Sequence, residues 1–209
     1  MAQLFFKYGA MNSGKSIELL KIAHNYEEQG KKVMVLTSAL DNRSGVGVVS
    51  SRIGISQPAT PVSQEDSILR IVNATLSTTT YVDGRAIWPE CILVDEAQFL
   101  TAQQVADLAT IVDSQDVPVI CFGLKTDFQG KLFEGSKALF EMADKLEETK
   151  TVCQWCDHKA TMNLRTVDGA PTYDGDQIQI GDQEYISVCR YHYTNPLIRA
   201  TKNKKEKEV

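Results

Sequence analysis

The most informative segment for chemistry lies near the N-terminus and reads Gly-Ala-Met-Asn-Ser-Gly-Lys-Ser, residues Gly9–Ser16. It fits the phosphate-binding pattern G-x-x-x-x-G-K-[ST], in which glycines let backbone N–H groups wrap phosphates. Lys15 would reach the β- and γ-phosphates, and the Ser16 hydroxyl would hold Mg²⁺ at a helix N-terminus. A glycine turn with an exposed lysine is the alternative, and the position between a strand and a helix argues against it. The segment therefore predicts a magnesium–nucleoside triphosphate site formed by Gly9, Ala10, Met11, Asn12, Ser13, Gly14, Lys15 and Ser16.

Two acidic residues, Asp95 and Glu96, follow the apolar run Ile92–Val94. Acidic residues often follow strands as helix caps, but beside a P-loop an acidic residue at a strand tip typically contacts the magnesium, and we assign that role to Asp95. Phosphoryl transfer also needs a group that orients or deprotonates the acceptor and a cation that absorbs developing charge. Glu96 is the candidate base. Arg52 is the candidate cation beside Lys15, although a lone loop arginine is also typical of an ordinary surface.

We extend the predicted nucleotide site through the two residues after the acidic pair, so that it includes Asp95, Glu96, Ala97 and Gln98.

The cysteines suggest a metal site. There are five, an odd number, and we expect a reducing compartment, so a disulfide framework explains them poorly. Two pairs have the spacing of a structural zinc site with four protein ligands, formed by Cys153, Cys156, Cys189 and His192. Because all four positions would be filled by protein, we expect zinc to stabilise structure and not to perform chemistry. His158 is a competing fourth ligand. The remaining thiols, Cys91 and Cys121, lie in or beside apolar strands and are predicted to be buried.

The elements that would position these residues follow an α/β pattern. Apolar runs predict strands at Leu4–Tyr8, Val33–Thr37, Ile92–Val94 and Val117–Phe122. Amphipathic spacing predicts helices at Ser16–Gln29, with Ile17, Leu20, Ala23 and Tyr26 on one face and Gly30 at its C-terminus, and at Thr101–Ser114, with Thr101 as the cap. The first strand, helix and second strand form a βαβ unit, which predicts a parallel pair. Such sheets bind ligands beyond the C-terminal ends of their strands, where Tyr8, Asp95 and Gly123 fall.

Other segments carry weaker signals. Asp41–Ser63 is rich in Gly, Ser and Pro and is expected to be a flexible loop or hairpin, and Ile68–Val72 a short helix. After Glu148 the pattern changes to cysteines and glycines. We therefore expect a nucleotide-binding domain at residues 1–148, a small zinc domain at 149–195 and a flexible charged tail at 196–209. Within the zinc domain, Gly169–Gly181 reads as a long loop ending in a short strand, which could cover a ligand.

Composition narrows the function classes. The net charge is −5 and the pI about 5.3, which argues against broad electrostatic binding to nucleic acid. The longest apolar runs are strand-sized, so we expect no membrane span. No signal peptide is recognisable at the N-terminus, which predicts a cytoplasmic protein.

Five ordered blocks give a specific resemblance: Ala10–Ser16, Val49–Gly54, Leu93–Leu100, Gly123–Gly130 and Tyr185–Tyr193. From Ala2 to about Tyr193 the chain resembles the thymidine kinase family of the zinc-containing, cytosolic type found in bacteria, some viruses and animals. The resemblance implies a RecA-like P-loop sheet with a small zinc-ribbon or lasso domain. It implies transfer of the ATP γ-phosphoryl group to the 5′-hydroxyl of thymidine, giving dTMP for DNA synthesis. It also implies a homotetramer and feedback inhibition by dTTP.

The resemblance further implies roles for single residues. Glu96 would accept the proton of the thymidine 5′-hydroxyl, and Asp95 would lie at the magnesium. Tyr185 would lie near the deoxyribose, and the backbone of 169–185 would bind the pyrimidine edge. The residues implied to pack round thymine are Phe99, Leu124, Phe128 and Phe133.

Two alternatives compete with a kinase. Asp95-Glu96-Ala97-Gln98 superficially resembles a helicase motif, so one alternative is a P-loop ATPase that acts on nucleic acid. Helicases need two such domains and a basic surface that tracks the nucleic acid, and this acidic chain offers neither. The other is a zinc-ribbon interaction module in which the P-loop only switches conformation. A nucleoside pocket predicts turnover of thymidine, whereas a switch predicts slow hydrolysis without an acceptor.

Overall fold

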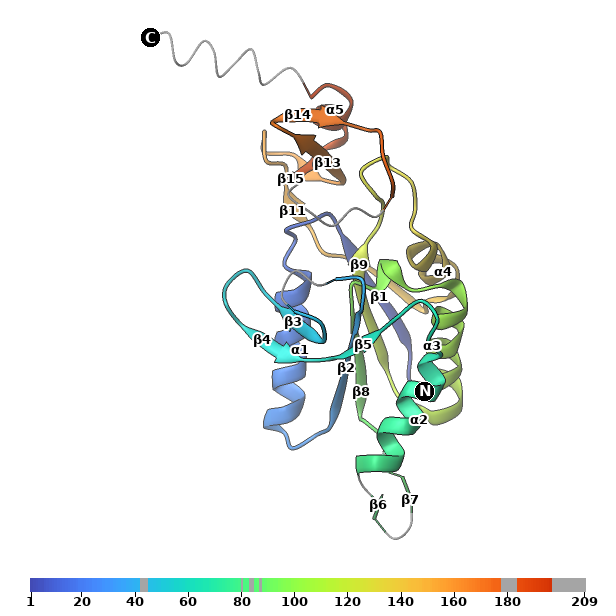
Figure 1. Ribbon diagram of the computed structural model, residues 1–209. Helices are drawn as coiled ribbons and strands as arrows, with labels where there is room; N and C mark the ends of the chain where they lie inside the picture. Colours follow the sequence, from blue (N-terminus) through green and yellow to red (C-terminus); the bar gives the residue numbers. More distant parts are fainter. Residues whose placement is uncertain (42–44, 80, 83–84, 87, 178–183, 197–209) are drawn as a thin grey trace.

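The computed structural model describes residues 1–41, 45–79, 81–82, 85–86, 88–177 and 184–196 of the chain (Figure 1). Its centre is a six-stranded sheet with the strand order β10-β1-β9-β8-β2-β5. Every neighbouring pair in this sheet is parallel. The strands are β1 (Leu4–Gly9), β2 (Val33–Ser38), β5 (Thr60–Val62), β8 (Cys91–Asp95), β9 (Val119–Leu124) and β10 (Lys145–Glu148).

Helices cover both faces of the sheet, as a buried parallel sheet requires (Figure 1). Helix α1 (Lys15–Glu28) packs on one face, against alternate strand residues such as Val35 and Leu93. The other face, which includes Leu36 and Ile92, is covered by α2 (Ile68–Thr79), α3 (Ala102–Gln115) and α4 (Glu134–Met142). The predicted α/β class with a parallel sheet is confirmed.

The helix boundaries follow the predicted signals. Gly14 precedes α1 with φ of 83°, a conformation that suits glycine, and Gly30 follows it with φ of 71°. Thr101 caps α3 through a capping box with Gln104. The predicted face of α1 is wrong at Ile17, which is 38% exposed, because its turn faces the phosphate cavity described below; Leu19 is buried instead.

The sheet order corrects the expected pairing of the first two strands. β1 and β2 run parallel in one sheet but are not neighbours, because β9 and β8 lie between them. The predicted strand ends Tyr8, Asp95 and Gly123 lie within one residue of the observed ones: Gly9, Asp95 and Leu124 end β1, β8 and β9 at one edge of the sheet. The third of these strands starts at Val119, two residues later than expected.

Some elements were not expected. The segment predicted as a loop or hairpin contains the hairpin β3 (Val48–Ser50) and β4 (Ser56–Pro58), while residues 42–44 lie outside the described residues. The same segment also supplies β5 to the main sheet. Helix α2 extends well beyond the predicted Val72, to Thr79, and ends next to the short pair β6 (Tyr81–Val82) and β7 (Arg85–Ala86). Neither α4 nor β10 was predicted.

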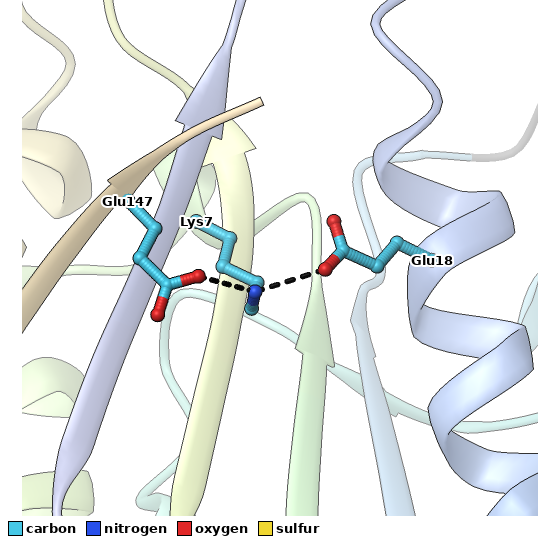
Figure 2. Close-up of polar contacts among 3 residues, drawn as sticks. All are labelled: Lys7, Glu18 and Glu147. Atoms are coloured by element: carbon cyan, nitrogen blue, oxygen red, sulfur yellow. Dashed lines mark hydrogen bonds and ion pairs between the residues drawn. The ribbon is translucent and has the colours of Figure 1, made fainter. Parts of the chain in front are cut away.

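A half-buried lysine ties three of these elements together near the phosphate loop (Figure 2). Lys7 on β1 lies 2.9 Å from a carboxylate oxygen of Glu18, in the first turn of α1, and 2.5 Å from one of Glu147 on β10. Partial burial works against the charged form of Lys7, but the bonds and attraction to Glu147 and Glu18 outweigh it and raise the pKa of Lys7. The triad therefore fixes the start of the helix that follows the P-loop.

A small unit lies beyond the C-terminal ends of the sheet strands (Figure 1). It contains β11 (Thr151–Val152), β12 (Lys159–Ala160), β13 (Met162–Val167), β14 (Ala170–Thr172), β15 (Glu184–Val188) and α5 (Arg190–Thr194). β13 is the central strand, paired antiparallel with β14 and β15. The segment expected as a loop from Gly169 thus begins with a strand, and its predicted terminal strand falls largely on 178–183, outside the described residues, as does the tail after residue 196. None of the helices in the described ranges has the length and apolar character to cross a bilayer.

Candidate functional site

A cavity of about 460 Å³ opens at the C-terminal edge of the sheet, around the P-loop. Lys15 reaches back across the loop, and its ammonium donates to the Ala10 carbonyl at 2.8 Å. Asn12, with φ of 60°, and Gly14 both adopt left-handed conformations that shape the turn. The cavity is lined by Met11, Asn12, Ser13, Gly14, Lys15, Ser16, Ile17, Asp41, Val48, Ser50, Ser51, Arg52, Asp95, Glu96 and Leu124.

The predicted magnesium pair is brought together. The Ser16 hydroxyl donates to a carboxylate oxygen of Asp95 at 3.0 Å. Burial, and then repulsion from Glu96, raise the pKa of Asp95 to about 7, although Ser16 and Lys15 act in the opposite direction. A hydroxyl and a carboxylate are oxygen ligands of the kind that Mg²⁺ prefers, so this pair fits a cation that would relieve the buried charge.

The candidate base lies in a strained conformation at the end of β8. Glu96 has φ of 50°, which is uncommon for a residue with a side chain and is found at functional sites. Its carboxylate accepts a hydrogen bond from the side-chain amide of Gln98. The Gln98 oxygen accepts from the Leu124 N–H at 3.0 Å, so one amide joins Glu96 to the end of β9. Gly123 allows this approach, since an added Cβ would lie 2.9 Å from that oxygen.

Ala97 and Gln98 therefore differ from the other predicted nucleotide residues. Both are buried, at 0% and 1% exposure, in the short helix η1 (Ala97–Phe99), and neither is among the residues that line the cavity. Gly9 and Ala10 are also buried and are not among the residues that line the cavity. An added Cβ at Gly9 would lie 2.5 Å from the Thr149 carbonyl oxygen, which shows how closely the chain leading to the small unit passes the P-loop.

The candidate cation reaches the same cavity from another element. Arg52 lies in the exposed turn between β3 and β4 and is one of the lining residues. Ser51 closes this turn, because its N–H and hydroxyl both donate to the Ile55 carbonyl. The structure thus places Arg52, Lys15 and Glu96 round one cavity.

The aromatic residues expected round a base form two contacts. Phe99 and Phe133 meet edge to face with ring centroids 5.6 Å apart. Phe128 meets Tyr185 at 6.5 Å, and the Arg165 guanidinium lies 4.8 Å from the Phe128 ring centroid. Leu124, by contrast, lines the phosphate cavity beside Glu96. Burial raises the pKa of Tyr185, which keeps its hydroxyl protonated.

Sequence reasoning missed a buried carboxylate beside these rings. Asp127, after the end of β9, accepts from the N–H groups of Gln129 and Lys131 at 2.9 and 2.8 Å. It also accepts from the side chain of Gln177 at 2.7 Å, and Gln129 donates to the Gly175 carbonyl at 3.0 Å. These hydrogen bonds hold residues 169–177, the described part of the loop expected to cover a ligand, next to Phe128. The position of Asp127 at a strand end was a usable signal for it.

The four predicted zinc ligands converge in the small unit. Their ligand atoms all lie within 4.8 Å of one another, and the Cys156 and Cys189 sulfurs are 3.8 Å apart. Zn–S bonds of about 2.3 Å at tetrahedral angles imply a sulfur–sulfur separation of about 3.8 Å, so the cluster fits zinc. Nδ1 of His192 lies 3.4 Å from the Cys153 sulfur. Within the described residues the cluster includes His192 and not His158, which approaches Cys156 at 3.3 Å.

The thiol of Cys153 is already disposed to ionise. Burial disfavours its thiolate, but the N–H groups of Cys189 and Trp155 and the contact with His192 outweigh burial and lower its pKa to about 6. By contrast, Cys91 and Cys121 are buried in the main domain, as expected, and desolvation raises the pKa of both thiols.

Comparison with known proteins agrees with this geometry. A family model described as thymidine kinase matches residues 2–193. A protein named thymidine kinase from Streptococcus pyogenes serotype M28 (strain MGAS6180) is 57% identical over 199 residues, which cover 95% of this chain and 100% of that protein. One of the same name from Streptococcus agalactiae serotype III is 57% identical over 197 residues, covering 94% of this chain and 99% of that protein.

Proposed function

The chain belongs to the thymidine kinase family, and we propose how its site carries out the transfer of a phosphoryl group from ATP to thymidine. The family and the named relatives make it a phosphotransferase with these two substrates. The comparisons give no support to a P-loop ATPase that acts on nucleic acid. The single observation that carries the mechanism is the convergence of Lys15, Glu96 and Arg52 on one cavity.

In the proposed reaction Glu96 takes the proton of the thymidine 5′-hydroxyl. The 5′-oxygen forms a bond to the γ-phosphorus while the bond from that phosphorus to the bridging oxygen of ADP breaks. Lys15 and Arg52 neutralise charge on the transferred group, and the backbone of the P-loop holds the β- and γ-phosphates. The products are dTMP and ADP, with the proton left on Glu96.

Ser16 and Asp95 would hold the magnesium. When bound, the ion would offset the negative charge of the ATP phosphates. Its binding requires the Asp95 carboxylate to be ionised, and the pKa of about 7 makes that a pH-dependent step. Gln98, through its side-chain hydrogen bond, would hold the Glu96 carboxylate in place for the acceptor.

Thymine would lie among the aromatic side chains, beneath the loop that Asp127 fastens. The hydrogen bonds from Gln177 to Asp127 and from Gln129 to Gly175 support a lid that excludes water from the γ-phosphoryl group. Tyr185 would lie near the deoxyribose. The residues proposed to contact the nucleoside remain Phe99, Leu124, Phe128, Phe133 and Tyr185.

We further propose a domain division at residues 1–148, 149–195 and 196–209, with zinc as a structural ion of the middle segment. Family resemblance also leads us to propose a cytoplasmic homotetramer, inhibited by dTTP, that does not act on nucleic acid. Light scattering of the purified protein would test the tetramer, and dTTP titration at fixed thymidine would test the inhibition.

The experiment that tests the function is ATP consumption with magnesium in the presence of thymidine, cytidine, deoxycytidine or no acceptor, with products identified. We expect dTMP with thymidine and almost no ADP without it. ATP hydrolysis that is indifferent to every nucleoside would rule out the kinase mechanism and favour a switch or a nucleic-acid ATPase.

A further inference from the structure

Two side chains of the small unit hold one residue of the P-loop. Asn163 on β13 and Ser187 on β15 form a cross-strand pair, and both are buried. The Asn163 oxygen accepts from the Met11 N–H at 2.8 Å. The Ser187 hydroxyl donates to the Met11 carbonyl. Both peptide groups of Met11 are therefore fixed by the zinc-bearing unit and not by the domain that contains the P-loop.

The other end of the Asn163 side chain contacts the nucleoside side of the site. Its NH₂ group donates to the Thr126 carbonyl at 3.0 Å, in a buried bond. Thr126 follows the end of β9 and precedes Asp127 and Phe128. A single carboxamide, 3% exposed, thus joins the phosphate loop to the segment that carries Phe128.

From Thr126 the connection continues to the covering loop. Asp127 orders its own segment through the N–H groups of Gln129 and Lys131, and it accepts from the Gln177 side chain. If nucleoside binding displaced the segment around Asp127, the Thr126 carbonyl, one residue away, would move with it. A displacement of Met11 on nucleotide binding would be felt at the opposite end of the same amide.

We propose that Asn163 is a positioning residue that couples ATP binding at the P-loop to thymidine binding near Phe128. The Asn163 side chain makes both hydrogen bonds only when Met11 and Thr126 are both in place. A buried amide group that loses its partner costs free energy. Each substrate that orders its own segment therefore favours the arrangement that binds the other, and the effect is reciprocal. The inference rests on the proposed function, because it takes thymidine as the occupant beside Phe128.

The test is a binding cycle by calorimetry on the full-length, zinc-loaded protein. The dissociation constant of a non-hydrolysable ATP analogue with magnesium is measured without thymidine and with saturating thymidine. We expect thymidine to tighten the analogue by about fivefold or more in the wild-type chain. In Asn163→Ala we expect this factor to fall to within about twofold of one, and thymidine affinity measured with and without the analogue to show the same loss.

Ser187→Ala is the matched control. It removes the other bond to Met11 but leaves the link from Met11 through Asn163 to Thr126. We expect it to weaken the analogue without removing the coupling factor. Loss of coupling in this control as well as in Asn163→Ala would assign the effect to general loosening of the β13–β15 pair, and would overturn the proposal.

Zinc content and thermal unfolding show whether each variant is folded. If Asn163→Ala does not fold, Asn163→Asp replaces it, because a carboxylate oxygen can still accept from Met11 but cannot donate to Thr126; we expect analogue binding without coupling. The inference would be contradicted if a folded Asn163 variant kept the full coupling. It would also be contradicted if the wild-type chain made dTMP but showed no coupling between the two ligands. Either result would leave the kinase function intact. A wild-type chain that makes no dTMP would instead contradict the proposed function.

Discussion

The side-chain amide of Gln98 donates to the Glu96 carboxylate while its oxygen is held by the peptide N–H at the end of β9. Gln98 is almost fully buried and does not line the cavity, so we infer that it contributes to the reaction by holding Glu96 and not by touching the nucleotide. Gln98 thus links the Glu96 carboxylate to Leu124 at the end of β9.

Gln98→Leu keeps the side-chain volume but removes both bonds. We expect kcat to fall about tenfold or more while KM for ATP changes little, because a misaimed base loses proton-transfer efficiency. Steady-state kinetics with each substrate varied would check this. A rise in KM for ATP with kcat unchanged would indicate instead that Gln98 serves nucleotide binding.

Glu96→Gln tests the base itself. We expect kcat to fall by about 10²- to 10⁴-fold, since the amide cannot take the proton of the 5′-hydroxyl. Binding of a non-hydrolysable ATP analogue should remain nearly unchanged. Glu141→Gln, an exposed change on α4, is the control and should retain wild-type turnover. Normal turnover in Glu96→Gln would show that another group accepts the proton.

Asp95→Asn tests the pH dependence of stability. The folded-state pKa of about 7 lies above the ordinary aspartate pKa of 3.8, so between these two pH values the folded protein holds a proton that the unfolded chain has lost. Stability of the ligand-free protein should therefore fall as pH rises through this window. Urea unfolding at several pH values should show Asp95→Asn more stable than wild type at about pH 8, by on the order of 2 kcal/mol, with that difference vanishing near pH 4. The variant should lose kinase activity because the magnesium contact is gone.

Lys7→Met tests the ion-pair triad at the start of α1. Its removal leaves the Glu18 and Glu147 carboxylates facing each other at a half-buried position, and we expect a loss of about 1–2 kcal/mol in urea unfolding. Glu147→Gln should cost less, because Glu147 is about half exposed and Lys7 keeps Glu18 as a partner. Equal losses in the two variants would show that the triad does not act through charge.

Cys153→Ser tests the zinc site. We expect the purified variant to contain substoichiometric zinc and to unfold at a lower temperature, since a structural zinc site contributes folding free energy directly. Cys121→Ala removes a buried thiol outside the cluster and should keep its zinc. Metal analysis with thermal unfolding measures both. Full zinc occupancy in Cys153→Ser would remove Cys153 from the ligand set.

The parts of the site predicted from sequence are those coded by short local patterns. The P-loop, the acidic pair at the end of β8 and each of the two ligand pairs of the zinc cluster span only a few consecutive residues. The side chains of the P-loop and of the acidic pair converge because parallel strands end at one edge of the sheet. The helix termini at Gly30 and Thr101 were predicted for the same local reason.

The missed elements lack such patterns. β10 reads Lys-Leu-Glu-Glu; it is an edge strand with mostly exposed residues and no continuous apolar run. β5 has three residues, one of them proline, so only pairing with β2 makes it a strand. The residues next to Asn163 in sequence give no sign of a special role. Its two side-chain hydrogen bonds form because the fold brings Met11 and Thr126, which are distant in sequence, next to it.

The sheet order also governs when the P-loop can be completed during synthesis. β1 leaves the ribosome first, yet its two partners are β9, which starts at Val119, and β10, which starts at Lys145. Until those strands emerge, the apolar residues of β1 have no neighbour to pair with, and long-range parallel pairing of this kind is slow. Residues Gly9–Ser16 can therefore take their final shape only after most of the polypeptide has been made, so a truncated nascent chain should bind no ATP although it already contains every residue of the phosphate loop.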